Sequence, residues 1–342
     1  MTALGVLWFF LVFVLIAGYF ILDGFDLGAG VLSPFVAKTE DEQAMVRRAI
    51  GPVWDGNEVW LLTAGGALFA AFPAAYATTF SGFYLAITLV LFGLIVRAVS
   101  IEYADRDPKP GWRKLWNALF FIGSLLPALL LGVAVGNVFA GIPMDANGDY
   151  CGVPLLGLLS PFTLLCGVLG LLLFMLQGAW WLSAKTPEDS TLRERCINLR
   201  MPLTALAVGV FIILTFMVSS VWGEMYPPLT VVRIAAAVLF LVLILAALFT
   251  TNGAKDDLRG FILCSASLLM LIALLATSMF PTLVFASGGV GQSITIATAA
   301  STDTALLAMT VIACIGVPLV LIWHFIVYRT FRGRIPANGE SY

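Results

Sequence analysis

Two pairs of acidic residues stand out because the sequence around them is almost free of charge. Asp23 and Asp26 lie in the segment GYFILDGFDLGAG, and Asp55 and Glu58 lie in GPVWDGNEVWLL. A spacing of three residues puts both carboxyl groups of a pair on one face of a helix. Carboxyl groups inside a helix bundle can relay protons, because each one can bind and release a proton. The two segments therefore predict a proton path.

An arginine can accompany these acids. Arg97 lies at the end of the third predicted helix, and a guanidinium beside a carboxylate keeps that carboxylate ionised. Each ionisable group in a membrane helix costs about 2.5–3.5 kcal/mol, so such groups are functional candidates. The alternative is structural, because Asp55 could cap a helix that begins near Pro52 and Asp23 could be an anion at the membrane interface. Four acids on two helix ends favour the proton path.

Ligands for a redox cofactor or a metal are scarce. The only histidine is His324, and one histidine near the end of a span is more often interfacial or hydrogen-bonded than a haem ligand. The five cysteines form no C-x-x-C pair, which argues against a zinc site and a disulfide framework. We expect this chain to bind no metal and no haem by itself. No phosphate loop is present, and nothing indicates a nucleic-acid partner.

The elements that carry the acids are membrane helices. Of the 342 residues, 61% are hydrophobic and 11% are charged, whereas a soluble domain has about 25% charged residues. Several charge-free runs exceed the roughly 20 apolar residues that one helical span needs. Lipid offers no hydrogen-bond partners, so these runs must be helical. The sequence predicts an all-α integral membrane protein with a single transmembrane domain over residues 1–342.

Nine transmembrane helices account for the apolar runs. The run from 54 to 97 is too long for one span and is cut at Pro73, because proline ends or kinks a helix. The first run has no basic segment before it and no cleavage site after it, so it is a span and not a signal peptide. The predicted spans are 3–24, 54–72, 74–99, 115–140, 156–183, 202–222, 229–250, 259–280 and 303–328.

Basic residues follow the odd-numbered spans, and the links after the even-numbered spans carry none. By the positive-inside rule, the N-terminus is then outside and the C-terminus is cytoplasmic. Only Arg97 and Arg233 fall outside this alternation, and the candidate acids lie toward the cytoplasmic side. The residues that define the alternation are Lys38, Arg47, Arg48, Arg106, Lys109, Arg113, Lys114, Lys185, Arg193, Arg195, Arg200, Lys255, Arg259, Arg329, Arg332 and Arg334.

Several segments resemble subunit II of the cytochrome bd-type quinol oxidases. The block WDGNEVWLLTAGGALFAAFP is the most specific of them, and the resemblance covers most of the chain. The segments are residues 18–30, 54–73, 81–86, 97–103, 121–137, 160–170, 177–182 and 279–281.

The resemblance implies a fold, a partner and a reaction. The implied fold is two four-helix bundles plus a peripheral helix. The implied partner is a larger sister subunit, subunit I, which carries haem b and haem d and forms a heterodimer with this chain. A small accessory subunit can join them, and membrane lipid surrounds them. The heterodimer would oxidise quinol and reduce oxygen to water in the bacterial cytoplasmic (inner) membrane, taking protons from the cytoplasm without pumping.

The resemblance also assigns roles to the candidate residues. Asp26 and Asp55 match acidic positions that feed protons toward the oxygen-reducing haem, and neighbouring polar positions match Asp23, Glu58 and Arg97. Some relatives have glutamine in place of Glu58, so Glu58 is expected to help and not to be essential. Trp60 matches a tryptophan near a lateral oxygen route, although with Trp54 it could also anchor its helix at the membrane interface.

A proton-coupled secondary transporter is the alternative from another functional class. Such transporters place charges and broken helices near the middle of the bilayer. The charges of this chain are expected toward one end of the spans, and no matching pair of broken spans is visible in two halves of the sequence. The sequence therefore favours the oxidase subunit.

Overall fold

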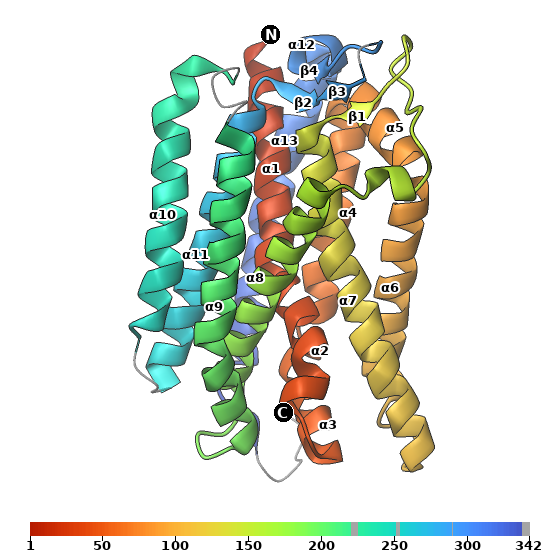
Figure 1. Ribbon diagram of the computed structural model, residues 1–342. Helices are drawn as coiled ribbons and strands as arrows, with labels where there is room; N and C mark the ends of the chain where they lie inside the picture. The colour runs from red at the N-terminus through yellow and green to blue at the C-terminus, as the bar shows by residue number, and fades with distance from the viewer. Residues whose placement is uncertain (220–224, 251–253, 289, 337–342) are drawn as a thin grey trace.

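Long helices that run along a common axis make up the computed structural model (Figure 1). It describes residues 1–219, 225–250, 254–288 and 290–336, without the side chains of residues 254 and 255. The long helices are α1 (Ala3–Leu22), α2 (Gly24–Val36), α3 (Glu40–Ile50), α4 (Trp54–Ala71), α5 (Pro73–Gly82), α6 (Tyr84–Tyr103), α7 (Pro110–Ala140), α8 (Pro161–Lys185), α9 (Thr191–Val218), α10 (Thr230–Leu248), α11 (Ala254–Met279) and α13 (Asp303–Thr330).

Eight helical stretches of the described chain are long and apolar enough to cross a membrane. The all-α membrane class is therefore confirmed. Helix α4 is outside this set, because Asp55, Asn57 and Glu58 make its first turns polar over a length of only 18 residues. The predicted count of nine spans depends on α4 and stays a prediction.

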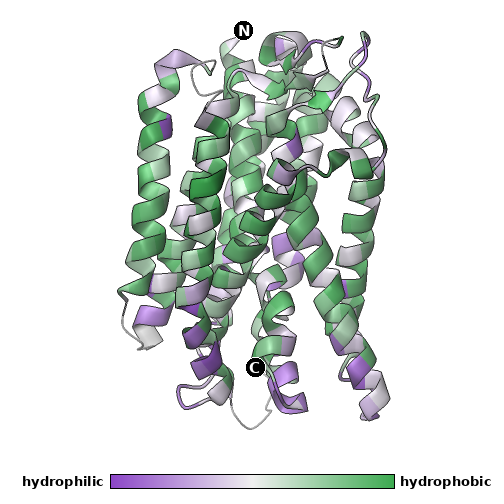
Figure 2. Ribbon diagram, viewed as in Figure 1, coloured by the Kyte–Doolittle hydropathy of each residue, from purple (hydrophilic) through white to green (hydrophobic). Residues whose placement is uncertain are grey.

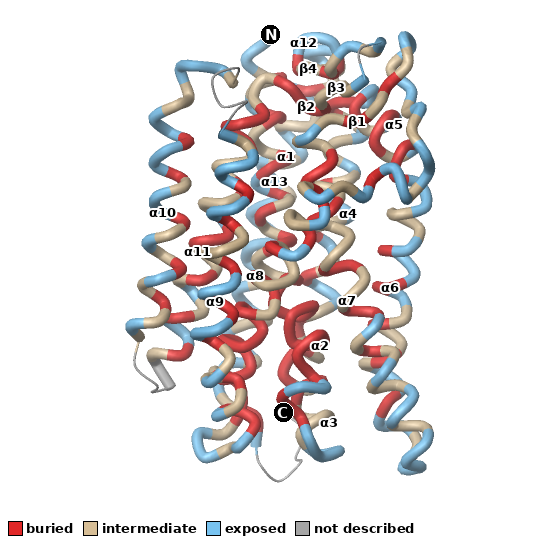
Figure 3. The backbone as a smooth tube through the Cα atoms, viewed as in Figure 1, coloured by how far each residue is buried: buried red, intermediate tan, exposed pale blue. Residues whose placement is uncertain are grey.

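The first helical stretch is longer than the predicted span 3–24. Helices α1 and α2 meet at Asp23 and together form one stretch of 34 residues, Ala3–Val36. Helix α2 is almost wholly buried (Figure 3), and it lies so close to α8 that a Cβ on Gly28 would be 1.8 Å from the Phe174 carbonyl oxygen. Because neighbouring helices cover α2, the chain continues as a helix beyond the predicted end. Asp23 and Asp26 thus lie inside a helical stretch and not at its end.

The other boundaries differ less. Pro73 begins α5 as predicted, and the span 74–99 is divided into α5 and α6 at Phe83. Helix α9 begins at Thr191 and not at 202, because its N-terminal turns carry arginines that form ion pairs with Asp257 of α11. The predicted end of that span at 222, the loop residue Gly289 and the side chain of Lys255 lie outside the described residues.

Three groups of buried side chains organise the bundle. One lies among α2, α3, α8 and α9. A second is formed mainly by α1, α4, α6 and α7, with side chains of α2, α8 and α11, and includes Phe9, Trp60 and Leu94. Side chains of α8, α9, α10 and α11 form another, which includes Phe240 and Leu268. Helix α13 has a single buried residue, Leu306, among its described residues. This arrangement agrees with two four-helix bundles plus a peripheral helix.

The two ends of the bundle differ in polarity. The polar links lie at the end opposite the N-terminus (Figure 2). The N-terminal end is covered by short strands and one short helix, and the Ile296 side chain contacts the helix there at Gly5. Strand β1 (Ile142–Pro143) pairs in parallel with β3 (Ala286–Ser287), β2 (Thr282–Val284) pairs antiparallel with β4 (Ile294–Thr295), and α12 (Ile296–Ala299) follows.

Candidate functional site

The first acid pair lies at the junction of α1 and α2. Asp23 ends α1, where its backbone N–H still donates to the Tyr19 carbonyl oxygen at 2.8 Å. Both Asp23 and Asp26 are fully buried. Between them, Gly24 lets the junction approach α8, since a Cβ there would come within 2.8 Å of Gln177 Oε1. Close packing therefore holds both carboxyl groups inside the bundle.

Arg97 of α6 connects both acid-bearing segments. Its Nη2 atom donates to Asp23 Oδ1 at 2.7 Å and to Glu58 Oε1 at 2.5 Å. Arg97 and Asp23 are fully buried, and 25% of the Glu58 side chain is exposed. Helix α7 packs tightly at this level, because a Cβ on Gly123 would lie 2.7 Å from the Arg97 backbone nitrogen. The cluster thus joins three separate helical segments around one guanidinium.

Asp26 has a different partner. Its Oδ2 atom accepts a hydrogen bond from Asn57 Nδ2 at 2.7 Å, and the same amide nitrogen donates to the Leu22 carbonyl oxygen at 3.0 Å. The Tyr328 hydroxyl of α13 donates to Asn57 Oδ1 at 3.0 Å. The structure therefore places Asp26 beside the Arg97 cluster, in a hydrogen-bond network with the uncharged side chains of Asn57 and Tyr328.

Asp55 lies apart from this network. It occupies the first turn of α4 and is exposed at the surface of the isolated chain. Asp55 is not the helix cap, because that position is held by Val53, which makes no side-chain capping bond. Glu58 lies one turn further along the same helix and is the nearest member of the cluster in sequence. The structure thus leaves Asp55 at the outer edge of the site.

Trp60 and His324 form a pair between α4 and α13. Trp60 Nε1 donates to His324 Nε2 at 3.2 Å, and His324 Nδ1 lies 2.9 Å from the Val320 carbonyl oxygen. The two bonds together indicate a neutral ring with its proton on Nδ1. Trp60 is buried against α1, where a Cβ on Gly18 would be 2.4 Å from the indole. Trp60 is therefore an internal contact and not an exposed interface anchor.

Ligands for a haem or a metal are few among the described residues. Both ring nitrogens of His324 are used in hydrogen bonds. Within the described residues, no group of three histidine, cysteine or acidic side chains is placed to bind a metal ion. The cysteines are free, and they are distributed over separate elements. What this site offers is carboxyl groups for proton exchange.

The cluster lies deeper than the predicted position near the cytoplasmic ends of the helices. Arg97 precedes the last residue of α6, Tyr103, by six positions, which is about 9 Å along the helix axis. In Figure 2 this level is seen as a purple region at the lower end of α4, and the polar end of the bundle lies below it. On the α1–α2 stretch and on α6, the charges therefore have further helical turns on both sides, whereas α4 begins one turn before Glu58.

Sequence reasoning missed several polar residues of the site. The spacing of the acids does not single out Asn57, and Gln177 and Tyr328 belong to no pattern in the sequence. Gln177 Nε2 donates to Ser265 Oγ at 3.2 Å. Among the described atoms, several buried polar ones at this level have no partner, namely Tyr19 Oη, Asp23 Oδ2, Asp26 Oδ1, Arg97 Nε, Arg97 Nη1 and Gln177 Oε1. Buried polar atoms of this kind commonly bind ordered water.

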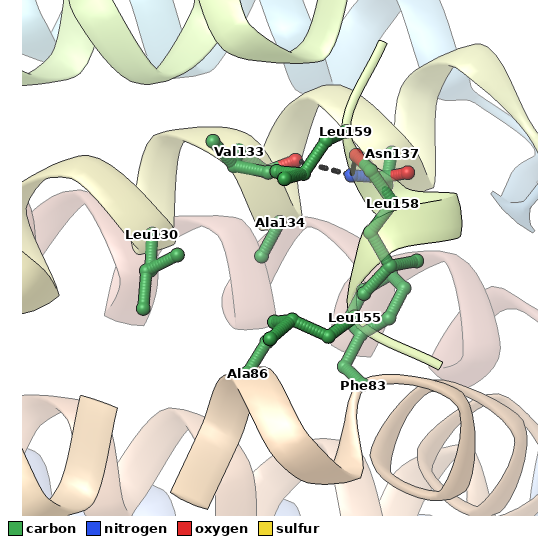
Figure 4. A pocket seen from close by; sticks show the side chains of 9 residues that line it. All are labelled: Phe83, Ala86, Leu130, Val133, Ala134, Asn137, Leu155, Leu158 and Leu159. Carbon is green, nitrogen blue, oxygen red and sulfur yellow. Dashed lines mark hydrogen bonds between the residues drawn. The ribbon is translucent and has the colours of Figure 1, made fainter. Parts of the chain in front are cut away.

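A small apolar pocket lies near the other end of α6 (Figure 4). Its one polar side chain, Asn137, already donates to the Val133 and Leu158 carbonyl oxygens at 2.8 Å each. No titratable group faces the pocket, so it does not extend the acid cluster. Its lining residues are Phe83, Ala86, Leu130, Val133, Ala134, Asn137, Leu155, Leu158 and Leu159.

Comparisons with known proteins agree over almost the whole chain. The family model described as cytochrome bd terminal oxidase subunit II matches residues 4–331. The chain is 34% identical to the probable cytochrome oxidase subunit 2 of Haemophilus influenzae, over 97% of this chain and 95% of that protein. It is also 34% identical to the cytochrome bd-I ubiquinol oxidase subunit 2 of Escherichia coli K12, over 96% and 94% of the two chains. The cytochrome bd ubiquinol oxidase subunit 2 of Bacillus subtilis is 34% identical, over 96% and 97%.

A solved structure shares the fold. The bd oxidase from Geobacillus thermodenitrificans contains a chain that superposes with a TM-score of 0.76 and 16% sequence identity. The superposition covers 96% of this chain and 99% of that chain. At this identity the likeness concerns the arrangement of helices.

Proposed function

The chain belongs to the family of cytochrome bd terminal oxidase subunit II and is thus a subunit of a bd-type quinol oxidase, and we propose that it gives this enzyme a cytoplasmic proton path and a scaffold. It is a multi-pass protein of the bacterial inner membrane. In this proposal the N-terminus is outside and the C-terminus is cytoplasmic, because the basic links share one end of the bundle. Quinol oxidation releases protons on the outer side and oxygen reduction consumes cytoplasmic protons, so no pump is required.

The proposal of a proton path rests on the excess of acids over bases in the buried cluster. One guanidinium, that of Arg97, contacts the carboxyl groups of Asp23 and Glu58, and Asp26 adds a third acid at the same level. If all of these acids were ionised, the membrane interior would hold a net negative charge, which is costly. A cluster with this composition has acids that can bind protons and pass them on.

The proposed path begins at Asp55. In the assembled enzyme this carboxyl group would lie at the boundary with the sister subunit, where it can receive protons that enter from the cytoplasmic side, and Glu58 lies one helical turn away from it. Glu58 in turn shares Arg97 with Asp23, and Asp26 lies one turn beyond Asp23. Trp60 closes the α13 side of the cluster and forms, in this proposal, one wall of a lateral oxygen route. The path thus leads from the surface into the bundle.

The exposed position of Asp55 supports a protein partner on this face. A carboxylate that faced lipid at this depth would cost about 2.5–3.5 kcal/mol. Cover by a second protein removes that contact with lipid. We assign this cover to the sister subunit, on which we also place haem b, haem d and quinol oxidation. A small accessory subunit and bound lipid remain predictions.

Replacing Asp55 by Asn tests the proton path. We expect oxygen consumption by the purified oxidase to fall by about 100-fold, since proton transfer by a positioned group contributes about 10²–10⁴-fold, while the haem absorption bands and the subunit ratio stay unchanged. The matched control is Glu102→Gln, which alters an exposed acid at the end of α6 that is outside the cluster. Unchanged turnover of the Asp55 variant would leave only the scaffold role.

The transporter alternative is not favoured. The family assignment points to an oxidase, and the carboxyl groups gather around one arginine instead of lining two matching broken helices. Copurification of this chain with haem absorption bands distinguishes the two functions, because a transporter would be purified without them.

A further inference from the structure

Asn57 is the uncharged centre of the polar network. Its side chain is fully buried. The amide nitrogen donates to the Leu22 carbonyl oxygen at 3.0 Å and to Asp26 Oδ2 at 2.7 Å, and the amide oxygen accepts from the Tyr328 hydroxyl at 3.0 Å. The junction of α1 and α2, helix α4 and helix α13 therefore meet at one amide group.

These contacts fix the orientation of the amide. The two N–H donors of Asn57 face two acceptors, Leu22 O and Asp26 Oδ2. A reversed amide would set its own oxygen against both acceptors, which cannot donate when Asp26 is ionised. Asp26 Oδ2 thus has a fixed donor, whereas Asp26 Oδ1 has no partner among the described atoms. The amide leaves one carboxyl oxygen in place to accept a proton.

Tyr328 connects helix α13 to this hydrogen-bond network. Most of this helix is exposed in the isolated chain, and Leu306 is its one buried residue in the described part. Near its cytoplasmic end it is joined to α4 by the Tyr328–Asn57 bond and, one turn earlier, by the His324–Trp60 bond. A change in the position of α13 against α4 would therefore directly alter the hydrogen bond between Tyr328 and Asn57.

We infer that Asn57 is a positioning residue for proton transfer, which orients the Asp26 carboxyl group and couples that orientation to the docking of α13. A side-chain amide is neither protonated nor deprotonated at neutral pH, so Asn57 acts through Asp26. This inference rests on the proposed function, in which Asp26 is part of the proton path.

A double-mutant cycle in the purified oxidase complex tests the inference. The variants are Asn57→Ala, Asp26→Asn and the two together, and the measurement is oxygen consumption per haem as a function of pH. We expect Asn57→Ala to lower turnover roughly 10-fold, as for the loss of a hydrogen bond to a charged group. The pH dependence of turnover should also change, because the Asp26 carboxyl group loses its fixed donor. The second change should have no further effect in the Asp26→Asn background.

Other charged and titratable groups face Asp26 and could move the pH profile. They are Asp23 at the junction, Glu58 on α4, Arg97 on α6 and Tyr328 on α13. Tyr328→Phe serves as the second variant, because it keeps both donors of Asn57 and lies on the peripheral helix. We expect it to shift the profile in the same direction as Asn57→Ala, by a smaller amount.

Several results would overturn the inference. A purely structural role predicts that Asn57→Ala lowers turnover by the same factor at every pH, or only in proportion to lost haem. An independent role predicts an equal effect of Asn57→Ala in the Asp26→Asn background. If Asp26→Asn itself keeps full turnover, the proton role of Asp26 fails as well, whereas an inactive Asp26→Asn with an unaffected Asn57→Ala refutes the positioning role alone.

Discussion

Two buried ionic clusters of this chain have opposite composition. Around Arg97, one guanidinium contacts the carboxyl groups of Asp23 and Glu58. Around Asp257, one carboxylate accepts from three arginines, which are Arg193 at 2.8 Å, Arg200 at 2.6 Å and Arg334 at 3.4 Å. The first cluster is rich in acids and lies among membrane helices, and the second is rich in bases and lies at their polar end.

The composition decides what each cluster can do. Arginine stays protonated in proteins, so the group of three arginines around Asp257 cannot exchange protons. Its contacts are structural, since Asp257 lies in the first turn of α11, Arg193 lies in the first turn of α9 and the Arg200 guanidinium stacks 3.5 Å from the Trp180 ring centre. Carboxyl groups do bind and release protons. The acid-rich cluster is therefore suited to proton exchange, and the base-rich cluster is suited to joining helices.

The largest effect is expected from Arg97→Met. Removing one member of a buried ion pair costs about 3–5 kcal/mol, because the other charge stays buried without a partner. We expect loss of assembled oxidase at neutral pH, measured as haem per membrane protein. Asp23 and Glu58 can regain neutrality by binding protons, so assembly should recover in part at acidic pH. An Arg97→Met variant that assembles equally well at neutral and acidic pH would contradict this view of the cluster.

A smaller loss of stability is expected from Asp257→Asn. The substitution removes the charge that Arg193, Arg200 and Arg334 share, and we expect a cost of about 2–3 kcal/mol, because the arginines lie nearer to water than Arg97 does. The measurement is the thermal unfolding of the purified complex. Acidic pH should restore nothing, since the arginines keep their charge. Recovery at low pH, like that expected for Arg97→Met, would remove the distinction between the two clusters.

Sequence reasoning found the acid-rich cluster more completely than its surroundings. The spacing of Asp23, Glu58 and Arg97 in apolar runs predicted a common site, because few other charges are available in the membrane. The same reasoning could not orient Asp55, since its exposure depends on the rotation of α4 about its axis. Residue types alone thus located the candidate acids, and packing decided which of them are buried.

The fold was predicted to about the same extent as the site. Apolar runs and Pro73 identified the helices, but hydropathy could not show that α2 continues the first helix, because this depends on contacts with α8. The Asn57–Tyr328 bond joins residues 271 positions apart in the chain. No local pattern reports such a contact. The part of the site that depends on α13 therefore required the tertiary structure.

The smallest effect is expected at an ion pair outside the membrane helices. This pair extends the comparison of the two buried clusters to an acid that lies close to water. Glu42 of α3 accepts from Arg195 Nη1 at 2.9 Å and from the Lys38 backbone N–H at 2.6 Å. Burial alone would raise the pKa of Glu42, but the hydrogen bonds from Lys38, Arg195 and Thr191 outweigh it and hold that pKa below its ordinary value. Glu42 binds its proton less readily in the folded chain than in the unfolded chain.

The sign of the pH effect follows from this depressed pKa. Stability from Glu42 is fully present above the pKa of an unfolded glutamate, about 4.3, and is lost as the pH falls through the lower folded value. Below about pH 4, the unfolding temperature of the complex should therefore decline more steeply for the native chain than for Glu42→Gln, which has no proton to bind there. At pH 7 the native chain should be slightly more stable, since a partly exposed pair contributes about 1 kcal/mol or less. Parallel pH curves for the two chains would show that Arg195 and Lys38 do not stabilise the carboxylate, and would leave the two buried clusters as the sites where charge governs the stability of this bundle.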